Sequence, residues 1–340
     1  MSETTLSSEE LQADDVAAID ELRTAYQHLR EELAKIIVGQ DEVIEQLAIC
    51  LFARGHALLM GVPGLAKTLL VSRLAETMSL SFSRIQFTPD LMPMDITGTE
   101  ILQDDGSGRR AFEFAKGPVF ANIVLADEIN RAPSKTQAAM LEAMQEHRVT
   151  VAGHSFELEQ PFFVLATQNP IEQEGTYPLP EAQLDRFMFM IGVDYPSRDE
   201  EIAIARTTTG ATLPSLNHIL DGEKVLRFQS LVRRVPVPEH IYHFAVDLVR
   251  RTRPDSDESP DWISPYVGWG AGPRAVQYLI LGARARAAIQ GSYMVRQEDL
   301  IAVAEPVLRH RVVKTFTAES EGITCRSIIS KLIEELSSEA

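Results

Sequence analysis

A glycine-rich loop that ends in Lys-Thr is the segment of this chain best suited to bind phosphate. Residues 61–68 read Gly-Val-Pro-Gly-Leu-Ala-Lys-Thr and follow the apolar run 56–60, which is typical of a buried parallel strand. In such a loop, backbone N–H groups point at the β- and γ-phosphates of a nucleotide, the lysine adds a positive charge, and the threonine hydroxyl binds magnesium. A surface turn between a strand and a helix is the alternative. The predicted nucleotide-binding residues of this segment are Gly61, Val62, Pro63, Gly64, Leu65, Ala66, Lys67, Thr68 and Leu69, with Thr68 also a magnesium ligand.

One residue of the loop departs from the strict phosphate-binding pattern. Ala66 stands where that pattern has glycine. Only a residue with positive φ requires glycine, so alanine fits this position if Ala66 already has helical dihedral angles.

An acidic pair at the end of an apolar run is the second chemical signal. Asp127 and Glu128 follow the run Asn-Ile-Val-Leu-Ala at 122–126. When a strand lies beside a phosphate-binding loop, an acid at its carboxyl end reaches magnesium, and a second acid polarises the attacking water. We therefore expect Asp127 to bind the metal and Glu128 to act as the catalytic base. The alternative is an ordinary helix N-terminus, where the helix dipole favours acidic residues.

Length and composition indicate an ordinary globular protein. The chain has 340 residues, of which 45% are hydrophobic and 24% charged, and this length favours two domains. No apolar stretch reaches the roughly 18 residues that a membrane span needs, and the acidic, Ser/Thr-rich beginning of the chain lacks the layout of a signal peptide. The expectation is a cytoplasmic protein with no membrane insertion.

The charge balance bears on the choice of partner. Lys and Arg number 32 against 49 Asp and Glu, which gives a formal net charge of −17. Such a chain repels nucleic acid unless a local basic face compensates. No long run of basic residues occurs, only pairs such as Arg233-Arg234. A nucleic-acid partner is therefore disfavoured.

Alternating apolar strands and helices must position the loop and the acids. We expect an α/β fold in which helices cover both faces of a parallel sheet. Two hairpins, at 100–114 and 148–159, interrupt this alternation, and from residue 196 onward the pattern is helical only. The expected organisation is a flexible N-terminus (1–14), an α/β nucleotide-binding domain (15–195) and an all-α lid domain (196–340). The expected sheet strands lie near 56–60, 84–87, 122–126, 162–167 and 187–191.

Five motifs in one order give a specific family resemblance. Besides the loop, they are Ala126-Asp-Glu-Ile-Asn-Arg-Ala-Pro133, Ala166-Thr-Gln-Asn-Pro170, Leu179-Pro-Glu-Ala-Gln-Leu-Asp-Arg-Phe187 and Gly272-Pro-Arg-Ala275. The chain resembles the MoxR family of AAA+ ATPases from about Ile37 to its C-terminal helices. Ala66 matches what this family usually carries, and the two hairpins resemble the insertions of its wider clade.

The resemblance implies further site residues. Asn169 matches sensor 1, whose amide binds the γ-phosphate and the attacking water, although Asn-Pro is otherwise typical of a turn. Arg274 matches sensor 2, a lid cation that closes on the γ-phosphate, although a lone arginine at a helix start is usually solvated. Arg186 matches the arginine finger, which acts on the nucleotide of the neighbouring subunit. A salt bridge to a nearby acid is the alternative for Arg186. The residues that resemble an adenine-binding stretch are Val38, Gly39 and Gln40.

The resemblance also implies a function. It indicates a ring-forming ATPase, with six copies expected from the resemblance. Such a ring uses ATP and Mg²⁺ to remodel or mature protein complexes. Partners containing a von Willebrand factor A (VWA) domain, and metal or cofactor loading of a client enzyme, are associated with this family. Two other functions stay open at this point: a nucleic-acid motor or loader on the same core, and a scaffold that binds ATP without hydrolysis, against which Glu128 argues.

Overall fold

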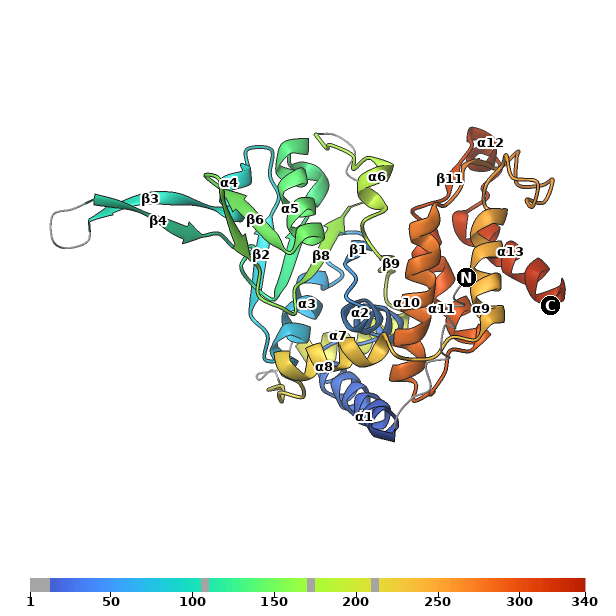
Figure 1. Cartoon of the computed structure of the whole chain (residues 1–340), viewed down its shortest axis with the longest axis horizontal. Coiled ribbons are helices and arrows are strands. Elements are labelled where there is room, and N and C mark those ends of the chain that lie inside the picture. Colours follow the sequence, from blue (N-terminus) through green and yellow to red (C-terminus); the bar gives the residue numbers. More distant parts are fainter. Residues whose placement is uncertain (1–12, 105–109, 170–174, 209–213, 340) are drawn as a thin grey trace, which may run out of the picture.

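A five-stranded parallel sheet forms the centre of the N-terminal half of the chain. The computed structural model describes residues 13–104, 110–169, 175–208 and 214–339 (Figure 1). The strands follow the order β2-β5-β8-β1-β9, and every neighbouring pair is parallel, as expected. Their bounds are β1 (Ala57–Met60), β2 (Phe82–Gln86), β5 (Ile123–Asp127), β8 (Phe163–Gln168) and β9 (Phe189–Gly192).

Helices bury both faces of this sheet, which explains why its central strands are almost continuously apolar. All five residues of β5 are buried. Leu59 and Leu125 face the cluster that contains α1 (Ala13–Ala34), α2 (Asp41–Phe52) and α3 (Lys67–Thr77), whereas Leu58 and Val124 face the cluster around α5 (Ser134–Glu146). Successive side chains of a strand point to opposite faces, so a doubly covered strand must be apolar at every position. The carboxyl ends of β1, β5 and β8 consequently meet at one edge of the sheet.

Two hairpins leave the sheet layer where the sequence predicts them. The first pairs β3 (Gly98–Asp104) with β4 (Arg110–Lys116) and extends far from the body of the molecule (Figure 1). The residues at its tip, 105–109, lie outside the described residues. The second pairs β6 (Arg148–Val151) with β7 (His154–Glu157). Phe114 of β4 stacks on Phe156 of β7, with ring centroids 4.0 Å apart, so the two hairpins contact each other.

Helices dominate the C-terminal half, with one exception. Periodic apolar positions in the sequence predict six helices, near 197–208, 222–234, 238–252, 273–289, 296–311 and 324–337, and all six are present. The expectation of a purely helical pattern after residue 195 is wrong. The strands β10 (Val267–Trp269) and β11 (Val313–Lys314) form an antiparallel pair. Strands this short carry no periodic apolar pattern, and hydrogen bonds between distant segments create them. The helices are α7 (Arg198–Thr208), α8 (Gly222–Val232), α9 (Glu239–Arg251), α10 (Pro273–Ile289), α11 (Gln297–Leu308), α12 (Phe316–Ser320) and α13 (Cys325–Glu339).

The helical half packs directly on the sheet half. Leu22 of α1, Leu47 of α2, Phe228 of α8 and Leu279 of α10 are fully buried in one continuous apolar cluster. The division at residue 195 stays a prediction. Within the described residues, no helix combines the length and apolar character needed to cross a bilayer. The remaining short elements are α4 (Pro93–Thr97), the 3₁₀ turn η1 (Ile129–Arg131) and α6 (Glu181–Leu184).

Candidate functional site

A cavity of about 440 Å³ lies at the edge where β1, β5 and β8 end. It brings the predicted phosphate loop together with the acidic pair and with Asn169. The acidic pair and Asn169 lie more than fifty positions after the loop in the sequence. Its lining residues are Pro63, Gly64, Leu65, Ala66, Lys67, Thr68, Leu69, Arg84, Asp127, Glu128, Thr167 and Asn169.

The loop forms an open cradle around the start of α3. Gly64 has φ +87°, and a Cβ atom placed there would meet nothing within 4 Å, so the backbone faces open space. Lys67 Nζ donates to the Gly61 and Val62 carbonyls, at 2.5 and 3.2 Å, which holds the ammonium against the loop. Burial lowers the pKa of Lys67, and the charge of Asp127 acts in the opposite direction. Backbone N–H groups, a helix start and an ammonium group are the elements of a phosphate site.

Ala66 does not have helical dihedral angles, so the condition under which alanine fits without strain is not met. Its φ is +54° and its ψ is 22°, in the left-handed region. The chain turns sharply from the loop into α3 at this residue, and the turn requires positive φ. Alanine adopts this region at a cost of about 1 kcal/mol relative to glycine.

Asp127 is almost buried and has defined partners on both carboxylate oxygens. Its Oδ1 accepts a hydrogen bond of 2.6 Å from the Thr167 hydroxyl, and the backbone N–H of Glu128 donates to the same hydroxyl at 2.8 Å. Its Oδ2 accepts from Arg84 of β2, from Nη2 at 2.6 Å and from Nε at 3.0 Å. Threonine therefore orients the acidic pair, and the arginine balances the charge of the buried acid.

Glu128 lies in a strained backbone conformation with its carboxylate at the cavity. Its φ is +56°, which is rare for a residue with a side chain and is characteristic of functional sites. Its Oε2 accepts from Gln86 Nε2 at 2.8 Å and from Arg131 Nη1 at 3.1 Å. The carboxylate is thus held in one orientation beside the loop.

Three residues of this network were not predicted as site residues. Arg84 and Gln86 are two positions apart on β2 and contact Asp127 and Glu128 respectively. The sequence feature that could have identified them is the alternation of a cation and an amide, Arg84 and Gln86, around the buried Ile85. Thr167 lies within a recognised motif, but only its neighbour Asn169 was given a role.

The predicted adenine-binding stretch contacts the loop. Gln40 Nε2 donates to the Leu65 carbonyl at 3.2 Å, and its buried Oε1 has no hydrogen-bond partner among the described residues. Gly39 has φ +74°, and an added Cβ would lie 2.2 Å from Glu200 Oε1 of α7. A buried acceptor without a partner suits a ligand that carries an amine. Val38 precedes these two residues and is half-buried.

The two predicted arginines do not belong to the lining of this cavity. Arg186 follows α6, and its Nη1 donates to the Leu141 carbonyl of α5 at 3.2 Å. Arg274, at the start of α10, donates to Asp185 Oδ2 at 3.0 Å. The structure therefore places Arg274 beside the residue that precedes Arg186, and the predicted roles of both arginines stay predictions.

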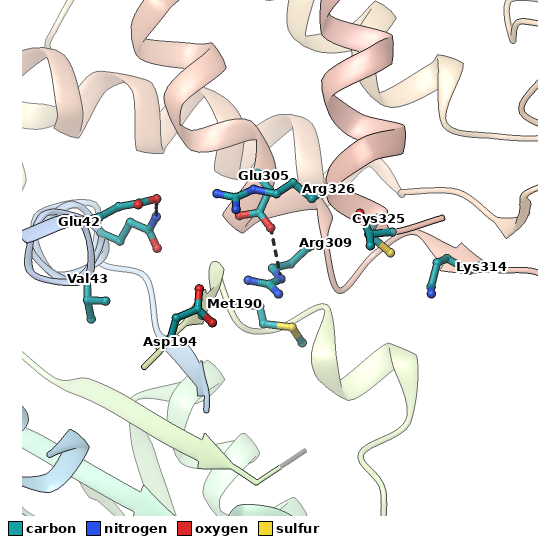
Figure 2. Close-up of a pocket in the computed structure, with 12 residues that line it drawn as sticks. Glu42, Val43, Met190, Asp194, Glu305, Arg309, Lys314, Cys325 and Arg326 are labelled. Carbon is teal, nitrogen blue, oxygen red and sulfur yellow. Dashed lines mark hydrogen bonds and ion pairs between the residues drawn. The ribbon is translucent and has the colours of Figure 1, made fainter. Parts of the chain in front are cut away.

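A second cavity, of about 430 Å³, lies along β9 between α2, α11 and the start of α13. Figure 2 shows the ion pair between Glu305 and Arg309 within it, 3.4 Å long. Burial raises the pKa of Glu305, whereas Arg309 lowers it. Its lining includes the acids Glu42, Asp194 and Glu305 and the bases Arg309, Lys314 and Arg326. Three carboxylates among three cations do not suit a polyphosphate, so we assign the candidate site to the first cavity.

Comparison with known families supports this assignment. Residues 56–189 match the ATPase family associated with various cellular activities (AAA). Residues 261–332 match the AAA lid domain. The first match contains the loop and the acidic pair, and the second contains Arg274.

Individual relatives resemble the chain over most of their length. Chaperone MoxR1 of Mycobacterium tuberculosis is 45% identical over 303 residues, which cover 89% of this chain and 79% of the relative. YeaC of Bacillus subtilis is 40% identical, with 89% and 91% covered. Protein MoxR of Methylorubrum extorquens is 31% identical, with 87% and 90% covered. A crystal structure of a Cytophaga hutchinsonii protein superposes with a TM-score of 0.87 at 41% identity, covering 94% and 96% of the two chains.

Proposed function

The chain belongs to the MoxR family of AAA+ ATPases, and from this premise we propose that it is a magnesium-dependent ATP hydrolase that acts as a ring of identical copies. The observation that carries the proposal is the convergence of Lys67, Thr68, Asp127 and Glu128 on one cavity. The reaction would cleave the terminal phosphoanhydride bond of ATP to give ADP and phosphate.

The donor set fits magnesium and a triphosphate. Magnesium prefers oxygen ligands, and Thr68 and Asp127 offer a hydroxyl and a carboxylate at the cavity. When bound there, the ion would neutralise charge on the β- and γ-phosphates. Lys67 would add an ammonium group on the same side, and Gln40 would accept a hydrogen bond from the adenine amine with its free Oε1.

Glu128 and Asn169 would handle the attacking water. The Glu128 carboxylate would accept the proton of the water, and the strained backbone with the Gln86 contact would fix its direction. The Asn169 amide would orient the water and the γ-phosphate. It follows β8, next to the strand that ends in Asp127, so its position supports this role.

Arg186 and Arg274 would complete the site of a neighbouring copy. Both lie outside the lining of the cavity in their own chain, and the contact of Arg274 with Asp185 brings the two arginines to the same segment. A site completed by the next copy requires a head-to-tail interface, which closes into a ring. The family resemblance favours six copies. An arginine finger contributes about 10³- to 10⁵-fold to the rate, so an isolated copy would be nearly inactive.

The work of the ring would be done on a protein. The β3–β4 hairpin extends from the body and exposes apolar side chains, with Leu102 52% and Phe112 71% accessible (Figure 1). Leu102 and Phe112 are direct cross-strand partners, so they form one apolar patch suited to a polypeptide. We propose that the ring remodels a client protein in the manner of a chaperone, together with a VWA-domain partner. The remodelling would mature an enzyme or load it with metal.

Phosphate release from three forms of the protein tests the proposed hydrolysis. The unmodified chain should release phosphate from ATP with magnesium present. Glu128→Gln should bind ATP and assemble but release none, and Lys67→Ala should bind no nucleotide. Equal phosphate release from the unmodified chain and Glu128→Gln would contradict the assignment of the base.

A nucleic-acid motor is the other function that this core can serve. It needs a basic hairpin, but Arg148 of β6 is paired with Glu146 at 3.5 Å. Filter binding of DNA and RNA at two salt concentrations decides between the two functions, because genuine phosphate contacts give a steep salt dependence. We expect no binding at either concentration.

A further inference from the structure

The segment that carries Arg186 is bound by the buried guanidinium group of Arg311. Arg311 follows α11, and its side chain is only 2% exposed. Its Nε donates to Asp185 Oδ1 at 2.7 Å, and its Nη2 donates to the Asp185 carbonyl at 2.8 Å and to the Phe187 carbonyl at 2.7 Å. Its Nη1 donates to the Met188 carbonyl at 3.3 Å. The contacts of Arg311 therefore flank Arg186 on both sides.

Two neighbours of Arg311 hold the same segment. The Tyr278 hydroxyl of α10 donates to the carbonyl of Arg186 itself at 3.1 Å. The ring Nε2 of His310 lies 3.1 Å from the Phe187 carbonyl. The Arg311 guanidinium lies over the Tyr278 ring, 5.1 Å from its centroid. Side chains from the helical half thus bind every carbonyl from Asp185 to Met188.

Burying the Arg311 guanidinium costs free energy, which indicates that the position of this segment is important. A buried guanidinium loses its hydration, and burial accordingly lowers the pKa of Arg311. The carboxylate of Asp185 and three backbone carbonyls compensate for that loss with charge-assisted hydrogen bonds. The planar fork of arginine fixes all of these acceptors in one geometry, which lysine cannot do.

We propose that Arg311 is a positioning residue for Arg186. It fixes the backbone from which Arg186 extends, so that the Arg186 side chain reaches the nucleotide of the neighbouring copy. Among the described residues, no hydrogen bond joins the Arg186 side chain to Arg311. The Arg186 side chain donates to the Leu141 carbonyl, and it could exchange that carbonyl for a phosphate. The inference rests on the proposed function, because it presupposes that Arg186 acts across the interface. Because Arg311 belongs to the helical half, the position of Arg186 would depend on how the helical half packs.

Mixing of variants separates a misplaced finger from a damaged pocket. Arg311→Met is expected to bind a fluorescent ATP analogue and to assemble as the unmodified chain does, while its ATP turnover falls at least about tenfold. Glu128→Gln has an intact finger and no catalytic base. In a one-to-one mixture, the Glu128→Gln copies should supply fingers to the intact pockets of Arg311→Met copies, and activity should return to about a quarter of the normal rate for random assembly.

Two further variants complete the test. Arg311→Lys keeps the buried charge but not the fork, so it is expected to fold and to show the same loss and the same rescue. Arg309→Met is the matched control, because Arg309 lies two positions away and pairs with Glu305 instead. Its turnover should stay within about twofold of normal.

Four results would overturn the proposal. Normal turnover by Arg311→Met while Arg186→Ala is inactive would leave the proposed function standing and remove the role of Arg311. Loss of turnover without rescue in the mixture would place the defect outside the finger. Loss of nucleotide binding by Arg311→Met would also place the defect outside the finger. Failure of both Arg311 variants to fold would assign Arg311 to stability. Equal turnover by Arg186→Ala and the unmodified chain would instead refute the proposed function itself.

Discussion

Arg84 donates two hydrogen bonds to a single oxygen of Asp127, at 2.6 and 3.0 Å, while Thr167 holds the other oxygen. The acid proposed to bind magnesium is therefore paired with a guanidinium inside the same cavity. β2 is the strand farthest from β1 on this side of the sheet, so Arg84 lies across the cavity from the loop. A triphosphate that reaches across the cavity would meet this cation at its terminal phosphate.

Removal of Arg84 should weaken binding of ATP more than binding of ADP. A hydrogen bond to a charged group contributes about 1.5 to 3 kcal/mol, so Arg84→Met is expected to raise the Kd for ATP about tenfold or more and the Kd for ADP far less. Titration of the Glu128→Gln protein, with and without Arg84→Met, with ATP and with ADP measures this difference without hydrolysis. Arg73→Met is the control, because Arg73 on α3 pairs with Glu76 outside the cavity lining. An equal change for both nucleotides would contradict a contact with the terminal phosphate.

Substitutions of Ala66 should follow its left-handed conformation. Ala66→Gly removes strain of about 1 kcal/mol but gives the unfolded chain more freedom, so the free energy of unfolding should change by less than about 1 kcal/mol. Ala66→Val places a β-branched side chain at φ +54°, and it should lower both stability and ATP affinity. Urea unfolding and ATP titration of the two variants provide the measurement. If valine were tolerated as well as glycine, residue 66 would not be left-handed in solution.

The stacked rings of Phe114 and Phe156 should contribute to hairpin stability. Their centroids are 4.0 Å apart with an interplanar angle of 18°. Phe156→Ala is expected to lower the free energy of unfolding by about 2 kcal/mol and to speed hydrogen exchange in β6 and β7. Phe112→Ala is the matched control on β4, since Phe112 is 71% exposed and should change stability by less than about 0.5 kcal/mol. Similar exchange rates in both variants would show that the hairpins move independently.

His56 should make the protein less stable in acid. It is buried before β1, where its Nδ1 accepts from the Val164 N–H at 3.0 Å and its Nε2 lies 3.1 Å from the Met144 carbonyl, an arrangement that suits the neutral ring. Burial lowers the pKa of His56 to about 4. The unfolded chain, with a histidine pKa of about 6.5, binds this proton first, so the contribution of His56 is complete above about pH 6.5 and is lost as the pH falls toward 4.

Urea unfolding at several pH values measures this loss. Between pH 6.5 and 5, one such histidine accounts for about 2 kcal/mol of the free energy of unfolding. In His56→Gln this titration is absent. The free energy of unfolding of the variant should be lower at pH 7, and between pH 6.5 and 5 it should fall by about 2 kcal/mol less than that of the unmodified chain. An identical slope in the variant and the unmodified chain would mean that His56 titrates normally in the folded state.

The sequence predicts those features of the site that depend on neighbours along the chain. Lys67 belongs to a contiguous loop, and Asp127 and Glu128 end an apolar strand whose type is evident from composition. Asn169 also lies at the end of an apolar strand, but only the family resemblance indicated its role. Because parallel strands end at a common edge, local patterns were enough to predict that Lys67, Asp127 and Glu128 lie close together. The same reasoning found both hairpins and the six longer C-terminal helices.

Other features depend on contacts between distant segments or on the path of the backbone. Arg84 meets Asp127 across 43 positions, through the adjacency of β2 and β5, which no local pattern encodes. The pairing of β10 with β11 has the same origin. Alanine favours helical dihedral angles, and only the turn into α3 forces Ala66 into the left-handed region. The contact of Arg274 with Asp185 likewise joins segments 89 positions apart, and no local pattern encodes it.

The dependence of specific activity on protein concentration tests the shared site most directly. ATP turnover per copy should be measured over a wide dilution series, with the mass of the particles followed in the same samples. We predict that turnover per copy falls toward zero as rings dissociate, while single copies still bind ATP through Lys67 and its loop. Constant turnover per copy in samples that contain only single copies would contradict the account.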